Sequence, residues 1–179
     1  LLAFSKRRKD HRPRCMVTIH DVIPLLFPKA APRSRKARLF PVYRFLMSQI
    51  ASRSDLIVTD SDSSRTDIIR VMHLDDSPKI RTVHCGVSKL FQPENRELHD
   101  FSEDRPAQLL YVGRMDPYKN ITGLVNIFAR VRQICKFPVH LTIAGSIDPR
   151  YPEAPEMVKR MNLDSYVNWT GYLSDEELL

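Results

Sequence analysis

The chain has 179 residues, more than one small domain usually needs and fewer than two full α/β domains require. Hydrophobic residues make up 42% and charged residues 27%, a balance typical of a soluble globular protein with a real core. An integral membrane protein and a secretory signal peptide are both unexpected. No apolar run approaches ~20 residues, and in the opening LLAFSKRRKDHRPR the short apolar part precedes the basic part.

The formal charge of +7 is unevenly placed along the chain. Residues 1–38 contain eleven Lys or Arg against Asp10 and Asp21, a net of +9, whereas the remainder contains 17 basic and 19 acidic residues, a net of −2. A basic region of this kind suits anionic lipid headgroups. Nucleic acid is not expected, since no RNA-recognition or zinc-finger spacing occurs and no aromatics interleave with the basic run. A solvated tail that keeps the protein soluble remains the alternative.

The cysteines predict a reducing compartment. Cys15, Cys85 and Cys135 are far apart and lack paired metal-ligand spacing, so we expect reduced thiols rather than a disulfide framework. Together with the basic region, this favours a cytoplasmic protein, peripheral at the inner face of the membrane. The first residue is Leu rather than Met, which suggests a fragment.

Strand and helix patterns alternate along the first half of the chain. Residues 15–19 predict a strand that delivers His20 and Asp21 at its carboxyl end. Three prolines in the loop over residues 22–34 exclude regular structure there. The elements expected next are a helix over 35–52, a buried strand over 56–59, a helix over 65–72 capped by Ser61 or Ser63, and a strand over 79–84. The apolar face of the helix over 35–52 consists of Leu39, Tyr43, Leu46, Met47 and Ile50.

The composition changes after residue 88, where acidic residues, asparagine and proline replace apolar periodicity. We interpret residues 89–107 as an interdomain linker between a first domain over 1–88 and a second domain over 108–179. The second domain is predicted to contain a buried strand over 109–112, a helix over 118–135, a strand over 139–144, a proline-rich loop, a short helix over 157–161, a strand over 166–170, and a helix that begins at a capping box of Ser174 and Glu177.

This alternation predicts α/β architecture, with parallel sheets covered on both faces. Ligands of such sheets bind outside the carboxyl ends of the strands. Two candidate sites fall at such ends, His20–Asp21 and Gly113–Lys119.

The stretch LLYVGRMDPYKN over residues 109–120 carries the most chemistry. Gly113 permits a sharp exit from the strand, and Pro117 suits the first turn of a helix. Helix N-termini attract anions. Arg114 and Lys119 would add two cations beside the helix N-terminus predicted here. The pattern predicts a phosphate or diphosphate clamp, with a solvated basic loop as the alternative.

Six blocks in order resemble the retaining family-4 glycosyltransferases, in particular mannosyltransferase-like members that build lipopolysaccharide and exopolysaccharide. The blocks are TIHDVIPLLFP, DLIVTDSDSSRTDII, KIRTVHCGVSKLFQP, LLYVGRMDPYKN, LTIAGSIDPRY and VNWTGYLSDEEL. The resemblance implies the GT-B fold, two Rossmann-like doubly wound domains, both incomplete in this chain. It also implies transfer of a hexose, with mannose expected, from a nucleotide-diphosphate sugar such as GDP-mannose to a glycan or lipid-linked acceptor.

The same resemblance implies roles for individual residues. Arg114 and Lys119 would stabilise the leaving diphosphate without a metal ion or other cofactor, and Gly113 and Gly145 would bring backbone close to the donor. For Gly145, a plain turn is an equal alternative. His20 would line the sugar and acceptor side, where a structural histidine is the alternative. Asp21, also on the acceptor side, is expected in a turn rather than as a base, because transfer in these enzymes is thought to occur at the front face.

Some residues depart from the family pattern. Cys85 and Ser88 stand where Asn and Asp are common, and both are expected to be structural. The family's glycine-rich loop would precede Leu1, and its glutamate pair would follow Leu179, so the chain alone is expected to be inactive. Another GT-B enzyme (glycogen- or sucrose-synthase-like, or a nucleotide-sugar epimerase) and a non-catalytic GT-B scaffold remain alternatives.

Overall fold

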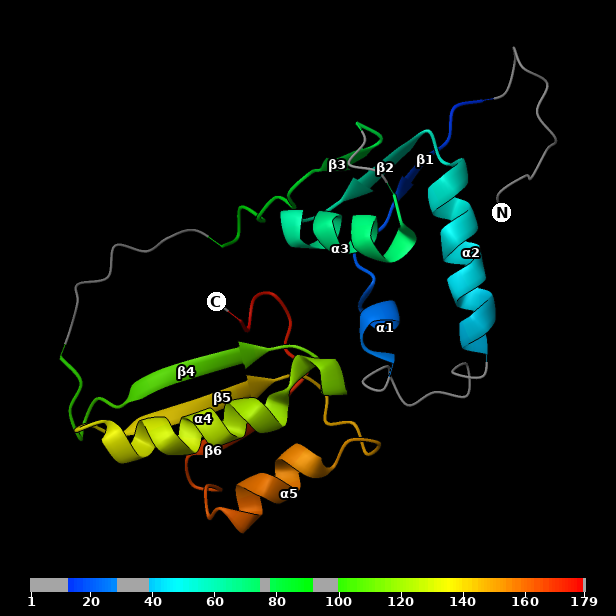
Figure 1. Cartoon of the computed structure of the whole chain (residues 1–179). Helices are drawn as coiled ribbons and strands as arrows, with labels where there is room; N and C mark the ends of the chain where they lie inside the picture. The colour runs from blue at the N-terminus through cyan, green and yellow to red at the C-terminus, as the bar shows by residue number, and fades with distance from the viewer. Residues whose placement is uncertain (1–12, 29–38, 75–77, 92–99, 179) are drawn as a thin grey trace. The chain divides into compact units, whose positions relative to one another are not determined.

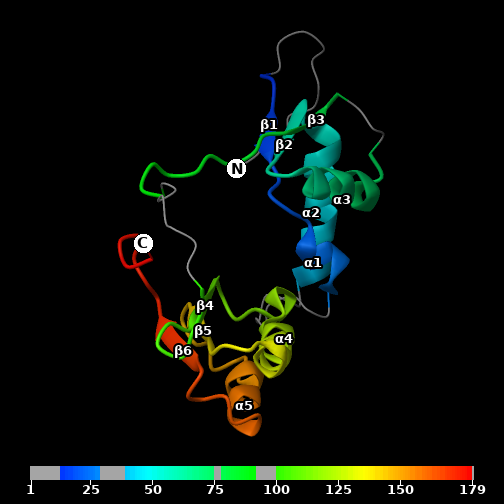
Figure 2. The same cartoon turned by 90° about the vertical axis from the view of Figure 1, so that its left-hand side faces the viewer.

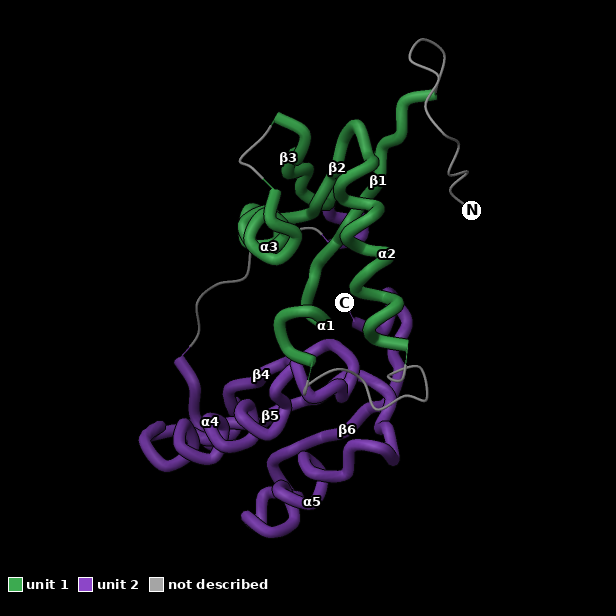
Figure 3. Tube along the Cα trace, turned by 45° about the vertical axis from the view of Figure 1, so that its right-hand side comes forward, with its two compact units in different colours: residues 1–28, 34–86 green, residues 29–33, 87–179 purple. Residues whose placement is uncertain are grey.

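The structure, a computed structural model, describes residues 13–28, 39–74, 78–91 and 100–178 (Figure 1). The chain divides into two compact units (Figure 3). Unit 1 comprises residues 1–28 and 34–86, and unit 2 comprises residues 29–33 and 87–179. Each unit is built on its own three-stranded parallel sheet, as the alternating pattern predicts.

Unit 1 has the strand order β1-β2-β3. Its strands and helices are β1 (Met16–Thr18), α1 (Ile23–Leu26), α2 (Phe40–Arg53), β2 (Leu56–Thr59), α3 (Asp62–Met72) and β3 (Ile80–Thr82). Each crossover leads to the next strand in the same direction, and right-handed crossovers of this kind place their helices on one face of the sheet. Helices α2 and α3 accordingly contact each other. The core beneath them consists of Ile19, Val22, Ala51, Ile57, Ile68 and Ile80.

Two predictions for unit 1 are corrected at its helix starts. The proline-rich loop contains a helical turn, α1, because Pro24 lies in the first turn, where its missing N–H is not needed. Helix α3 starts earlier than predicted because Ser61 caps it, its Oγ accepting a hydrogen bond of 3.1 Å from the Ser64 N–H. The choice between Ser61 and Ser63 is thereby settled in favour of Ser61.

Helix α2 matches only part of its predicted apolar face. Tyr43, Met47 and Ile50 are half-buried, whereas Leu39 and Leu46 are exposed. Ala51 is buried instead, so the contact with the sheet lies toward the C-terminal end of the helix. The first residues of the predicted helix, 35–38, lie outside the described residues.

Unit 2 has the strand order β4-β5-β6. Its elements are β4 (Ala107–Val112), the 3-10 turn η3 (Pro117–Lys119), α4 (Ile121–Ile134), β5 (Val139–Ala144), α5 (Glu153–Arg160) and β6 (Val167–Gly171). Figure 2 shows α4 and α5 on the same side of the sheet. The core between these layers is centred on Val125, Phe128, Leu141, Ile143 and Val158.

The predicted burial of residues 109–112 is wrong. Leu109, Leu110 and Val112 are 39%, 56% and 54% exposed. Among the described strands, β4 pairs with β5 alone and therefore lies at the sheet edge. The predicted coverage of both sheet faces is also not observed within the described residues, because α4 and α5 lie on the same side of the sheet (Figure 2). As in unit 1, right-handed crossovers that run in one direction place their helices on one face.

The helices of unit 2 start at different residues from those predicted. Helix α4 begins at Ile121, after a separate turn, and α5 begins at Glu153, inside the predicted loop. Pro155 lies in the first turn of α5, where a helix tolerates proline.

The capping box at the end of the described chain is confirmed. The Ser174 N–H donates to Glu177 Oε2 at 2.8 Å, and the Glu177 N–H donates to Ser174 Oγ at 3.3 Å. Hydrogen bonding of the Glu177 carboxylate to the Ser174 N–H, and secondly to the Ser174 side chain, lowers the pKa of Glu177.

Candidate functional site

Three glycines meet at the carboxyl edge of the unit 2 sheet. The Gly113 N–H donates to the Ala144 carbonyl at 2.9 Å, and the Gly145 N–H donates to the Gly171 carbonyl at 2.7 Å. A Cβ on Gly145 would overlap the Gly113 carbonyl oxygen, so this approach requires glycine. The edge therefore presents backbone without side chains at the ends of three neighbouring strands. Sequence reasoning singled out Gly113 and Gly145 but missed Gly171, although it lies in the block VNWTGYLSDEEL.

The segment after β4 separates buried from exposed side chains. Met115 and Asp116 are buried, whereas Arg114 points outward. The Arg114 side chain is 73% exposed, and its Nε lies 3.1 Å from Oδ2 of Asp116, whose side chain is 2% exposed. The Tyr111 hydroxyl donates to the Arg114 carbonyl at 3.1 Å. Because the Asp116 carboxylate contacts Nε of Arg114, the two Nη groups lie outside this ion pair. Both can donate hydrogen bonds to an anion.

The predicted helix N-terminus at Pro117 is corrected. Pro117 opens the turn η3, and the helix proper starts after Asn120, which has a left-handed φ of 54°. Asn120 Oδ1 accepts a hydrogen bond of 3.2 Å from the Gly123 N–H, so the chain caps its own helix. Lys119 lies on the turn, exposed, with its Nζ 5.2 Å from the centroid of the Tyr118 ring. Any anion site here depends on the side chains of Arg114 and Lys119 more than on helix N–H groups.

A small cavity lies behind this segment. It has a volume of about 220 Å³ and is lined by Met115, Asp116, Pro117, Ile121, Thr122, Tyr151, Glu153 and Ala154. Within the described residues, Asp116 Oδ1 is a buried side-chain oxygen without a hydrogen-bond partner. A buried carboxylate oxygen requires a donor, and a cavity of this size has room for a water molecule that would supply one.

The loop after β5 contains an ion pair between Asp148 and Arg150. Arg150 contacts Asp148 through both Nε and Nη2, at distances of 2.5–3.0 Å. These hydrogen bonds lower the pKa of Asp148 to about 2, with a smaller contribution from the charge of Arg114. Asp148 is therefore ionised at neutral pH, and sequence reasoning did not single it out.

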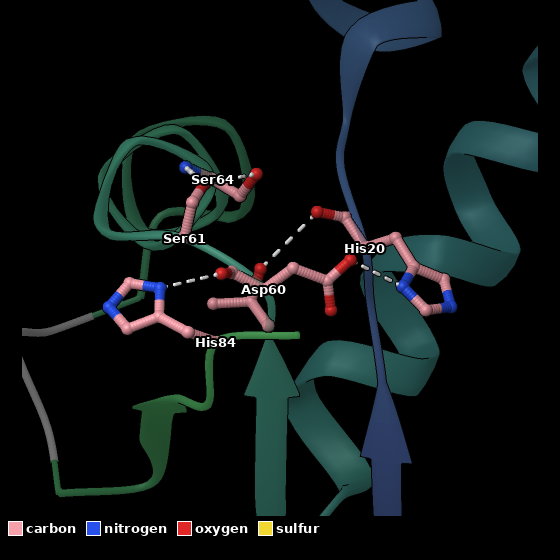
Figure 4. Close-up of polar contacts among 6 residues, drawn as sticks. His20, Asp60, Ser61, Ser64 and His84 are labelled. Atoms are coloured by element: carbon pink, nitrogen blue, oxygen red, sulfur yellow. Dashed lines mark hydrogen bonds and ion pairs between the residues drawn. The ribbon is translucent and has the colours of Figure 1, made fainter. Parts of the chain in front are cut away.

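Unit 1 gathers polar groups at the same edge of its own sheet. His20 follows β1, Asp60 follows β2, and His84 lies just beyond β3 (Figure 4). His20 Nδ1 lies 2.7 Å from Asp60 Oδ2, and His84 Nδ1 lies 3.1 Å from the Asp60 carbonyl oxygen. The Thr59 hydroxyl donates to the His20 carbonyl at 3.3 Å. Asp60 thus contacts two histidines, one through its side chain and one through its backbone.

Asp60 and His84 were missed by sequence reasoning. Asp60 directly follows the buried strand LIVT, so the strand-end rule that selected His20 would also have selected it. His84 was assigned to the predicted strand over 79–84, which in the structure ends at Thr82. Asp21 lies in a turn, as expected, because its Oδ1 accepts a hydrogen bond of 3.0 Å from the Ile23 N–H at the start of α1.

The predicted site residues fall into two groups. Gly113, Arg114, Lys119 and Gly145 belong to unit 2, and Gly113 contacts Gly145 directly. His20 and Asp21 belong to unit 1. Across the residues that the structure describes, no cluster of three or more His, Cys, Asp or Glu is arranged to hold a metal ion. Over the same ranges, no helix is long and apolar enough to cross a membrane.

The architecture matches a known fold, GT-B. Parallel α/β units of this kind occur in GT-B glycosyltransferases, and the solved structure of Anabaena HepE in complex with UDP and glucose has a TM-score of 0.65 to this chain. That likeness covers 90% of this chain and 42% of HepE at 16% sequence identity. Residues 92–179 match the family described as Glycosyl transferases group 1.

Two curated proteins are similar in sequence. The O-antigen chain mannosyltransferase B of Escherichia coli is 25% identical over 173 residues, which cover 92% of this chain and 43% of that protein. The sucrose synthase of Nitrosomonas europaea is 28% identical over 152 residues, which cover 64% of this chain and 19% of that protein. The chain therefore spans less than half the length of the curated relatives it matches.

Proposed function

We propose that this chain is part of a retaining glycosyltransferase that moves a hexose from a nucleotide-diphosphate sugar to a glycan or lipid-linked acceptor. The observation that carries the proposal is the exposed Arg114 guanidinium, held by buried Asp116 beside the glycine edge of unit 2. Lys119 supplies a second exposed cation on the same segment. A diphosphate is the ligand that such a fork, ammonium and bare backbone suit best.

The chemistry follows from the charge that develops during transfer. As the bond between the anomeric carbon and the diphosphate breaks, the leaving group gains negative charge. The acceptor hydroxyl oxygen bonds to the same carbon, and its proton passes to the departing diphosphate oxygen on the same face. Arg114 and Lys119 stabilise that charge more in the transition state than in the ground state, which accelerates the step. In this proposal, the cations do so without a metal ion.

A mannose donor, GDP-mannose, is the first candidate because the Escherichia coli relative is a mannosyltransferase. A second donor class also has specific support, since HepE was solved with UDP and glucose and a sucrose synthase is among the relatives. A full-length transfer assay with GDP-mannose, UDP-glucose and UDP-galactose distinguishes the two. Turnover of GDP-mannose alone supports the mannosyltransferase, and turnover of UDP-glucose alone replaces it with a glucosyltransferase.

Substitution in the same full-length enzyme tests the clamp. Arg114→Ala and Lys119→Ala should each reduce turnover strongly with an unchanged circular dichroism spectrum. A matched control is Arg70→Ala, which removes an exposed arginine paired with Asp67 on α3. Unchanged turnover in both test variants would reject the clamp. Binding of the nucleotide sugar without any turnover would support a non-catalytic scaffold instead.

His20 is the proposed contact to the sugar and acceptor from unit 1. Its side chain is 73% exposed at the carboxyl edge of the sheet, where an imidazole can hydrogen-bond a hydroxyl. His20→Ala should reduce turnover while leaving binding of the nucleotide diphosphate in unit 2 unchanged. Loss of both together would contradict a separate acceptor-side role.

We further propose that the protein is cytoplasmic and touches the inner face of an anionic membrane. Residues 1–38 carry a net charge of +9, and on α2 the side chains of Val42, Phe45 and Leu46 are exposed beside Arg44. Basic groups near such a surface contribute about 1 kcal/mol each. Flotation with anionic and neutral liposomes tests this, and charge reversal at Lys6 to Lys9 should weaken binding. Equal flotation with both liposomes would reject the membrane contact.

A further inference from the structure

His20 and Asp60 form a directed contact within unit 1. The 2.7 Å distance joins His20 Nδ1 to Asp60 Oδ2, and the two residues come from the ends of neighbouring strands (Figure 4). The Asp60 side chain is 34% exposed and the His20 side chain 73% exposed. An ionised carboxylate only accepts hydrogen bonds, so Nδ1 of His20 must be the donor.

This contact determines the hydrogen-bonding role of the other ring nitrogen, Nε2. A neutral histidine carries one ring proton, and a proton held on Nδ1 leaves Nε2 as a hydrogen-bond acceptor. In Figure 4, the second ring nitrogen of His20 points away from Asp60. His84 provides an internal comparison, since its Nδ1 faces the Asp60 carbonyl oxygen, which also only accepts.

We propose that Asp60 is a positioning residue that holds His20 in the Nδ1–H tautomer and presents Nε2 as an acceptor for a substrate hydroxyl. The ligand class is a polyol, such as the sugar or glycan acceptor. The role in transfer rests on the proposed function, but the tautomer does not. The β2–α3 junction further restrains Asp60, because its carbonyl accepts from His84 and the next residue, Ser61, caps α3.

Nuclear magnetic resonance of the whole chain, with ¹⁵N-labelled histidine, reads the tautomer directly. Long-range ¹H–¹⁵N spectra at about pH 8.5, where imidazole is neutral, distinguish Nδ1–H from Nε2–H in each of the six histidines. His20→Gln identifies the His20 signals by their loss. His20 is expected in the Nδ1–H form.

Two substitutions at Asp60 test the cause. Asp60→Ala should shift the tautomer of His20 toward Nε2–H. Asp60→Asn should shift it further, because the amide N–H can donate to an unprotonated Nδ1. His84 should keep its tautomer in both variants, because a backbone carbonyl holds it. Asp62→Asn, which removes a nearby carboxylate bonded to Thr82 at 2.7 Å, should leave His20 unchanged. A wild-type His20 in the Nε2–H form, or one unaffected by both Asp60 variants, would overturn the proposal.

Turnover of the full-length enzyme is measured separately. Asp60→Asn should reduce turnover about tenfold or more, the effect of one hydrogen bond to a charged group, with donor KM unchanged. Loss of turnover in Arg114→Ala with normal His20 tautomers would support the donor clamp independently. A shifted tautomer without loss of turnover would limit Asp60 to a structural contact and overturn its role in positioning.

Discussion

The junction between β2 and α3 in unit 1 and the junction between β4 and α4 in unit 2 differ in length and in what they bury. The first is residues 60–61, where Asp60 remains partly exposed and Ser61 caps the helix at once. The second is residues 113–120, which turn back over the core, bury Asp116 and expose Arg114.

The difference shows how junction length sets the electrostatics of a strand end. On the short junction, the carboxylate stays in partial contact with water and reaches a histidine on the neighbouring strand. On the long junction, the carboxylate is withdrawn from water, where its charge requires a partner. Asp116 is therefore expected to matter to stability as well as to position, whereas Asp60 should act mainly on position.

Removal of the nitrogen donor from each pair should give the largest contrast in stability. Arg114→Ala leaves Asp116 buried without its partner and should lower the free energy of unfolding by about 1–3 kcal/mol. His20→Ala breaks a partly exposed pair and should cost less than about 1 kcal/mol. Urea unfolding measures both, with Trp169 as the fluorescent reporter in unit 2 and circular dichroism for the whole chain. Equal losses would show that burial of the carboxylate does not distinguish the junctions.

The helix cap of the long junction should show the next largest effect. Asn120→Ala loses the hydrogen bond to the Gly123 N–H and places a β-carbon in a left-handed conformation, at a cost of about 1–2 kcal/mol. Asn120→Gly keeps the conformation and loses only the cap, so it should recover part of that stability. The same urea measurement tests both variants, and a glycine variant less stable than the alanine variant would contradict the assignment.

The cap of the short junction should matter slightly less. Ser61 has an ordinary extended conformation, so Ser61→Ala loses only the hydrogen bond to the Ser64 N–H and should cost about 1 kcal/mol. Ser63→Ala is the matched control on the same helix and should be near neutral. A larger loss of stability in Ser63→Ala than in Ser61→Ala would identify Ser63 as the cap instead. The readout is the urea midpoint by circular dichroism.

The smallest effect is expected at Asp148, a partly exposed carboxylate in unit 2. Its pKa is lowered to about 2 from an ordinary value of 3.8, first of all by the Arg150 side chain. A lowered folded-state pKa stabilises the protein above pH 3.8, and this contribution is lost as the pH falls through about 2. Arg150→Gln should return the pKa toward 3.8 and remove this contribution, a small loss of stability at neutral pH because water screens the partly exposed pair. Carboxyl titration by nuclear magnetic resonance measures the shift, and an unchanged pKa would exclude Arg150 as its cause.

The fold was largely predictable because its signals are local. Apolar runs located the strands, and glycine, proline and capping residues located most of their ends. The errors arose where neighbouring structure decides the outcome. The apolar run over 109–112 predicts burial, but an edge position leaves it exposed. Pro117 predicts a helix start, but Asn120 caps the helix one turn later.

Local sequence dictated that His20, Gly113 and Arg114 stand at strand ends and that positive charge gathers before residue 39, since periodicity and composition need no partner. Tertiary structure alone decided which groups meet there. His20 and Asp60 are 40 residues apart in sequence, and Gly113 reaches Gly145 only because β4 pairs with β5. Strand register and crossover handedness create these contacts, and neither is visible in the spacing of residues along the chain.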